Sequence, residues 1–177
     1  MTSQTLHSAL RDHTAAQHER LDASIGAFET LDAYRGFLRA SYRFRAAAET
    51  ALADFVPWPP LALAPLMKAD LAVLGETIPH APPPPGFAAS GPRRLGMSYV
   101  LEGSALGSRL LVQRARGLGL SAGNGAGHLA AQSSDRTRWP AFLHLLSDAP
   151  TPYHAEVLEG AALTFDLALA LYLPETI

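Results

Sequence analysis

The 177-residue chain contains no cysteine and a single lysine, Lys68. The absence of cysteine excludes disulfides, thiolate metal sites, iron–sulfur clusters and cysteine nucleophiles. A metal ligand in this protein must therefore be a histidine, a carboxylate or a tyrosine. Because lysine is so scarce, arginine carries nearly all the positive charge, which suits planar carboxylates and phosphates. The alanine-rich and proline-rich composition allows a second explanation for the arginines, a GC-biased genome.

Long hydrophobic runs and a strong net charge are also missing. No window holds 18 uninterrupted apolar residues, and MTSQTLHSALRDH has no basic region followed by an apolar stretch. The net charge of -2 creates no field that would attract nucleic acid or anionic lipid. We therefore expect a cytoplasmic protein without a secretory signal, with no nucleic-acid partner and no membrane partner.

Sustained alternation of apolar and polar residues is absent as well, and the apolar spacing instead predicts helices. The expected helices span residues 5–25, 31–55, 64–74, about 93–116, 139–146 and 151–173. Thr30 is the expected N-cap of the second helix, and PWPP should end it. The segments IPHAPPPPGFAASGP and GLGLSAGNGAGH are expected to be loops. The sequence thus predicts an all-α, single-domain fold over residues 1–177, with five to seven helices around one core.

Glycines interrupt the apolar helix YVLEGSALGSRLL, residues 99–111. Gly96, Gly103 and Gly107 lie within about 40° of one another on the helix surface. Three such glycines cost roughly 3 kcal/mol in helix propensity relative to alanine. Two arrangements would offset this cost: another helix that crosses closely, or a planar ligand that lies against the bare backbone.

The first predicted helix carries His18 at the edge of its apolar face, on the same stripe as Arg11 and Asp22. Asp22 follows His18 by four residues, a spacing at which a carboxylate can orient the imidazole ring. An ordinary surface histidine is one interpretation of this pattern. The other is a ligand site: histidine, a nearby cation and a glycine-rich partner helix suit a flat, anionic, metal-centred ligand such as heme.

Three segments, in order, resemble motifs of one protein family. LRDHTAAQHERLD resembles the proximal-helix motif L-x-x-x-T-x-x-x-H of heme oxygenases, which has an acidic residue four positions after the histidine. YVLEGSALGS resembles the E-G-S-x-L-G distal helix of the bacterial branch, and PLMKADLAVLG resembles the D-L-x-x-L-G segment near the middle of the family's sequences. The resemblance runs from about Leu6 to Leu173, and it implies a multihelical fold with heme between the first helix and a glycine-containing distal helix.

The resemblance also implies a heme site, whose expected residues are Arg11, His18, Asp22, Tyr99, Gly103, Ser104 and Gly107. His18 would ligate the iron and is the expected metal site. Gly103, Ser104 and Gly107 would form the catalytic surface on the oxygen side. Arg11 and Tyr99 fall where some bacterial members hold a heme propionate.

Two departures from the family pattern affect this expected site. Ser108 stands where most members have the second glycine of a Gly-Gly pair, which predicts slight crowding of the pocket. Residues 151–173 contain neither lysine nor arginine. Propionate contacts that other members draw from their last helix must come from elsewhere or be absent.

The activity implied by the resemblance is cleavage of heme, as substrate and cofactor, to biliverdin, CO and Fe²⁺. It uses O2 and electrons from an external reductase or ferredoxin. Two other hypotheses remain: a heme-binding or sensing protein of the same fold without turnover, and a helical interaction protein without heme. The sequence leaves open whether the product serves iron acquisition or supplies a bilin-using photoreceptor. We expect a monomer or a weak dimer.

Overall fold

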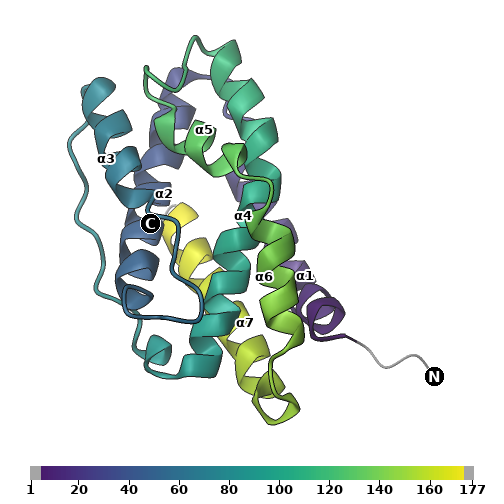
Figure 1. The fold of residues 1–177 in the computed structure, drawn as a ribbon. Coiled ribbons are helices and arrows are strands. Elements are labelled where there is room, and N and C mark those ends of the chain that lie inside the picture. Colours follow the sequence, from purple (N-terminus) through teal and green to yellow (C-terminus); the bar gives the residue numbers. More distant parts are fainter. Residues whose placement is uncertain (1–4, 174–177) are drawn as a thin grey trace.

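The computed structural model describes residues 5–173, and its regular elements are helices (Figure 1). The helices are α1 Leu6–Ile25, α2 Leu31–Ala51, α3 Ala64–Val73, η1 Gly86–Ala89, α4 Gly91–Gly117, α5 Gly127–Ser134, α6 Arg138–Ser147, η2 Thr151–Tyr153 and α7 His154–Tyr172. For the residues that are described, the predicted all-α class is confirmed. None of the described helices is both long and apolar enough to cross a membrane.

α7 lies at the centre of the bundle, and both α1 and α4 pack mainly against it. In Figure 1, α2 and α3 lie on one side of α7, whereas α1 and α6 lie on the other. Three apolar clusters form the core. Two of them share Leu21, Trp58 and Leu95, and Tyr172 joins one of these two to the remaining cluster. Two long helices, α1 and α4, are thereby fixed relative to each other through a third.

Side-chain caps start the two N-terminal helices where the sequence predicts. The Thr5 hydroxyl accepts a hydrogen bond from the Ser8 amide, and the Thr30 hydroxyl accepts one from the Ala33 amide. The predicted end of α2 at Phe55 is wrong by four residues. After Ala51 the backbone changes to hydrogen bonds that span three residues instead of four. One of them joins the Phe55 amide to the Leu52 carbonyl oxygen (3.0 Å), just before PWPP begins.

The two predicted loops each contain a short helix, and this part of the prediction is wrong. η1 lies within the proline-rich segment, and α5 begins in the glycine-rich segment at Gly127. α5 has no cap from its own neighbouring residues. Instead, the Asp70 carboxylate on α3 accepts hydrogen bonds from the amides of Gly127 and His128, both at 2.9 Å. The cap of α5 therefore comes from a residue 57 positions earlier in the sequence.

The crossing of α4 and α7 depends on two glycines. A Cβ atom at Gly96 would overlap the carbonyl oxygen of Val157 and lie 2.6 Å from the Ala161 nitrogen. A Cβ atom at Gly160 would overlap the carbonyl oxygen of Arg93. Close helix crossing is thus the reason for Gly96, the first of the three glycines on the α4 stripe.

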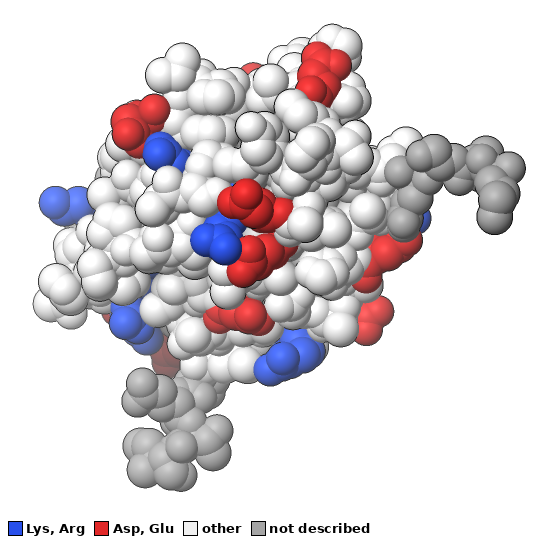
Figure 2. All heavy atoms as spheres, turned by 90° about the horizontal axis from the view of Figure 1, so that it is seen from below, with Lys and Arg blue, Asp and Glu red and all other residues white. Residues whose placement is uncertain are grey.

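Charged side chains of both signs are interspersed on the face seen in Figure 2, with wide uncharged areas between them. Several charged residues form ion pairs between elements, such as Arg94 on α4 with Asp54 (2.6 Å) and Arg93 on α4 with Glu159 on α7 (2.8 Å). Exposed pairs of this kind contribute little stability, so the buried contacts decide the arrangement of the helices.

The buried pair of Asp70 and His128 predicts a loss of stability in acid. Burial lowers the pKa of His128, although its 2.7 Å bond to Asp70 opposes this shift. Burial would raise the pKa of Asp70, but its hydrogen bonds from His128 and Gly127 hold the pKa below the usual value. A neutral folded histidine stabilises the protein fully above pH 6.5, and this contribution falls as the pH drops below that value.

We therefore expect His128→Asn to flatten the pH dependence of stability. Between about pH 6.5 and 5 the wild type should lose up to about 1.4 kcal/mol per pH unit from this residue, and the variant should not. Urea unfolding at several pH values measures the difference. Parallel curves for the two proteins would contradict the assignment of the titration to His128.

Candidate functional site

Contacts at two points tie α1 to α4, which otherwise have few close backbone contacts. At one end, the rings of His7 and Tyr99 lie 6.1 Å apart. At the other end, the Arg114 guanidinium donates a 2.6 Å hydrogen bond to the carbonyl oxygen of Gly26, just after α1. The two helices therefore run in the same direction, and each has a stretch of about four to five turns between the two contacts.

His18 lies near the middle of the α1 stretch. It is about 16 Å along the helix from His7, and Gly107 is about 12 Å along α4 from Tyr99. Both residues are therefore slightly past the midpoint between the two contacts. On a helical projection, His18 lies about 20° from His7, whereas Gly107 lies about 20° from Arg114 and about 80° from Tyr99. His18 and Gly107 thus lie at the same level along the two helices, between the two contacts.

The imidazole of His18 is held in place but remains accessible. Its Nδ1 lies 3.1 Å from the Asp22 carboxylate, as the spacing predicts, and its side chain is 61% exposed. The ring also makes an edge contact with Phe165 on α7, at 5.7 Å between centroids. With Nδ1 directed to Asp22, Nε2 is the nitrogen available to a metal, and hydrogen bonding of the other nitrogen to a carboxylate is common for metal-binding histidines.

The stretch of α4 between Tyr99 and Arg114, which lies level with His18, has little side-chain bulk and an apolar surface. A Cβ atom at Gly107 would meet no atom within 4 Å, and one at Gly103 would meet only the Trp139 ring, at 3.7 Å. Leu106 and Leu110, which flank these glycines on the same face, are 54% and 52% exposed. Exposed leucines beside bare backbone form a surface that a flat apolar ligand could cover.

The two predicted propionate residues, Arg11 on α1 and Tyr99 on α4, lie toward the same end of this stretch as the contact between His7 and Tyr99. Burial raises the pKa of Tyr99, and the positive charge of Arg11 acts in the opposite direction. The exposed Arg11 guanidinium also lies 3.4 Å from its neighbour Asp12. An arginine and a tyrosine beside the accessible face form a suitable pair for a carboxylate.

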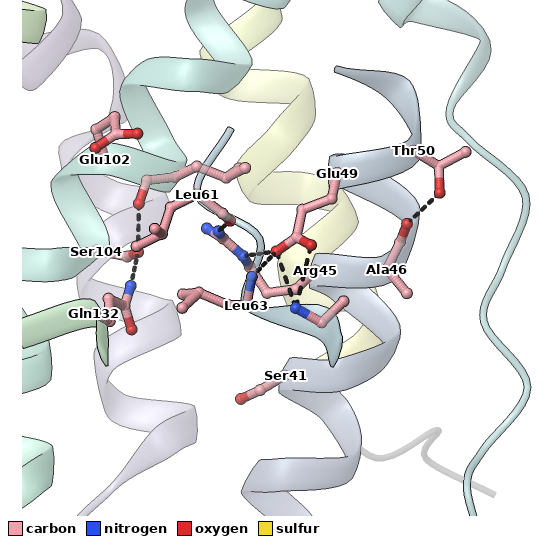
Figure 3. A network of polar contacts seen from close by, with 12 residues as sticks. Ser41, Arg45, Ala46, Glu49, Thr50, Leu61, Leu63, Glu102, Ser104 and Gln132 are labelled. Carbon is pink, nitrogen blue, oxygen red and sulfur yellow. Dashed lines mark hydrogen bonds and ion pairs between the residues drawn. The ribbon is translucent and has the colours of Figure 1, made fainter. Parts of the chain in front are cut away.

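The two serines of the distal segment point away from that stretch. The Ser104 hydroxyl donates to the carbonyl oxygen of Leu101 (2.6 Å) and accepts a bond from the Gln132 side chain (2.7 Å), as Figure 3 shows. Ser108 is buried and donates to the carbonyl oxygen of Ala105. On the helical projection both lie on the opposite side of Gly107 from Leu106 and Leu110, so their side chains point away from the exposed leucine face.

Trp139 and Phe165 are site residues that the sequence analysis missed. Trp139, on α6, packs between His7 and Tyr99 at ring distances of 5.7 and 5.8 Å and covers Gly103. Each aromatic fits the apolar spacing of its own helix, so no local signal separates it from an ordinary core residue. Their importance follows only from the neighbours that the fold supplies.

A buried ion pair on α2 holds the start of α3. Arg45 and Glu49 on α2 are bonded at 2.9 Å, and Glu49 also accepts bonds from the amides of Leu63 and Ala64 at the start of α3 (Figure 3). Burial lowers the pKa of Arg45, while the charge of Glu49 raises it. A cavity beside Arg45, of about 20 Å³, has room for about one water molecule.

Named proteins of other organisms are similar to this chain in sequence. No family model matches the sequence. The protein is 32% identical to the heme oxygenase PigA of Pseudomonas aeruginosa over 144 residues, which cover 75% of this chain and 73% of that protein. It is 37% identical to a heme oxygenase of Xanthomonas campestris over 91 residues, or 48% of this chain, and spans about half (54%) of that protein's length.

A solved structure extends the similarity to nearly the whole chain. The NO-bound and CO-bound heme oxygenase of Neisseria meningitidis matches with a TM-score of 0.81 and 26% identity, over 99% of this chain and 96% of that one. The fold and the facing helices thus define an all-α protein of the heme oxygenase type. The chain belongs to the heme oxygenase family, which confirms the resemblance found in the sequence.

Proposed function

We propose that this protein, as a single domain over residues 1–177, is a heme oxygenase that cleaves heme to biliverdin, CO and Fe²⁺ with O2. Electrons come from an external reductase or ferredoxin. The observation that carries the proposal is the pairing of an accessible, carboxylate-oriented His18 with the bare stretch of α4 at the same level. Family membership supports the same activity.

The donor set fits heme. His18 offers a neutral imidazole nitrogen for iron, because Asp22 engages the other nitrogen. Gly107 leaves the backbone of α4 open to a planar ring, and Gly103 adds no side chain beneath the Trp139 ring that covers it. Arg11 and Tyr99 would hold a propionate at one end of the stretch. Heme supplies the oxygen chemistry when it is bound.

The protein's own residues bind and orient the substrate and shield it from water. Phe165 contacts the His18 ring and Trp139 covers Gly103, so both aromatics would border the bound substrate. Leu106 and Leu110 would exclude water from the face on α4. Ser104 acts through the helix rather than as a proton donor, because its hydrogen is bonded to the Leu101 carbonyl. The hydrogen bond that the Ser104 hydroxyl accepts from Gln132 holds α4 against α5 and so fixes the position of Gly103.

Hemin titration followed by reduction in air tests the proposal. We expect a Soret shift with one heme bound per protein molecule, then loss of the Soret band and appearance of biliverdin absorption when electrons and O2 are supplied. A stable Soret band under these conditions would instead indicate a heme-binding or sensing protein. Absence of a Soret shift would exclude both heme hypotheses and would favour a helical interaction protein.

We further propose that the protein acts in the cytoplasm, as a monomer or weak dimer, and without nucleic-acid or membrane partners. Its product serves iron acquisition or a bilin-using photoreceptor. Size-exclusion chromatography with light scattering measures the oligomeric state. Deletion of the gene, followed by growth on heme as the iron source, distinguishes the two uses of the product.

A further inference from the structure

A second cavity, of about 220 Å³, lies between α4, α5 and α6. Leu106, Trp139 and Pro140 form its apolar wall, and the side chains of Arg109 and Arg136 line it from α4 and from the loop before α6. Pockets that enclose a whole drug-sized ligand measure about 300–1,000 Å³. This cavity therefore has room for part of a larger molecule, such as a carboxylate-bearing arm with the ring attached to it.

The lining of this cavity carries excess positive charge, because two arginines, Arg109 and Arg136, stand against one ionised carboxylate, Asp135. Asp135 accepts hydrogen bonds from the amide and hydroxyl of Thr137, which hold its pKa below the usual value. Glu102, in the adjoining cavity, pairs with Arg138 at 2.6 Å. Neither Arg109 nor Arg136 forms an ion pair with any other residue in 5–173. Two guanidinium groups are thus free to bind an anion.

Two residues connect this cavity to the candidate heme site. Trp139 lines the cavity and also covers Gly103. Leu106 lines the cavity and also belongs to the exposed face of α4 that faces α1. A molecule that leaves the stretch between α1 and α4 past Leu106 therefore reaches Arg109 and Arg136 without crossing a separate element.

We propose that this cavity is a subsite for the carboxylate arms of the ring-opened product, which it binds as the product leaves the heme site. This inference rests on the proposed function. The ligand class is an amphipathic dicarboxylate, and biliverdin carries two propionates on an apolar tetrapyrrole. Arg109 and Arg136 pair with the carboxylates, and Leu106 and Trp139 contact the pyrrole rings. Release of Fe²⁺ would end the link to His18, and the opened tetrapyrrole is flexible enough to reach the subsite.

Titration of the heme-free, full-length protein with biliverdin tests the proposal. Binding is followed by quenching of tryptophan fluorescence, since Trp139 lines the cavity. We expect Arg109→Gln and Arg136→Gln each to weaken biliverdin binding about three- to five-fold, and the double variant to weaken it about ten-fold. Biliverdin dimethyl ester, which lacks the charges, should bind equally to all variants.

Arg116→Gln is the matched control, because Arg116 is another exposed arginine of α4 that lies outside the cavity. Biliverdin affinity that falls no more in the cavity variants than in this control would overturn the proposal. An equal loss of hemin affinity in the cavity variants would also overturn it, because the arginines would then belong to the heme site itself. Absence of heme turnover in the wild type, with biliverdin binding retained, would instead refute the proposed function alone.

Discussion

Replacement of His18 by alanine is expected to abolish normal heme ligation and to reduce biliverdin formation at least about 100-fold. Loss of a single outer-shell partner commonly costs about 10–100-fold in metal affinity or activity, and loss of the ligand itself removes the iron bond outright. His18 contributes few packing contacts, since its side chain is 61% exposed. The variant should therefore fold normally, and any loss of function reflects the missing ligand.

The measurement is the Soret spectrum during hemin titration, together with the rate of biliverdin formation. His13→Ala is the matched control, because His13 is an exposed histidine on the opposite face of α1. Added imidazole should partly restore the spectrum of His18→Ala and leave the control unchanged. An unaltered Soret band in His18→Ala would exclude His18 as the ligand.

The largest effect on stability is expected from Gly96→Ala. The new methyl group would overlap the carbonyl oxygen of Val157, and this is backbone within the interior of α7 that cannot rotate away. Separation of the central helix from α4 should cost about 3 kcal/mol or more, which lowers Tm by roughly 6–12 °C for a domain of this size. Calorimetry of the heme-free protein measures this shift.

Gly107→Ala is the matched control for Gly96→Ala, because it adds the same methyl group to the same face of α4. No atom lies within 4 Å of that position, so the gain in helix propensity should stabilise the heme-free protein by about 1 kcal/mol. The same methyl group enters the proposed heme face and should weaken hemin binding. Equal Tm shifts in the two variants would show that the glycines do not differ in role.

The contrast between these two glycines shows where sequence reasoning stops. On a helical projection, Gly96, Gly103 and Gly107 form one stripe, and the sequence allows both a helix crossing and a planar ligand as its cause. The helix crossing explains Gly96, and the planar ligand is the proposed explanation for Gly107. Gly96 packs against α7, whereas Gly107 is open, because α7 crosses α4 close to the N-terminal end of α4.

Local chemistry made most of the helices predictable. Thr5 and Thr30 cap their helices through residues three positions away, and the apolar period of each helix is continuous. α5 escaped prediction because its cap, Asp70, lies on another helix. The same limit applies to Trp139, whose place over Gly103 depends on how α6 packs on α4.

The sequence by itself determined the helical class, the family resemblance and the pairing of His18 with Asp22, because each depends on residues close together along the backbone. Only the tertiary structure decided which face of α4 lies level with His18, and which glycine serves packing. It also brought Arg109 and Arg136 to one cavity. Such relations depend on the crossing of helices that are far apart in sequence, and helical periodicity within one segment carries no information about them.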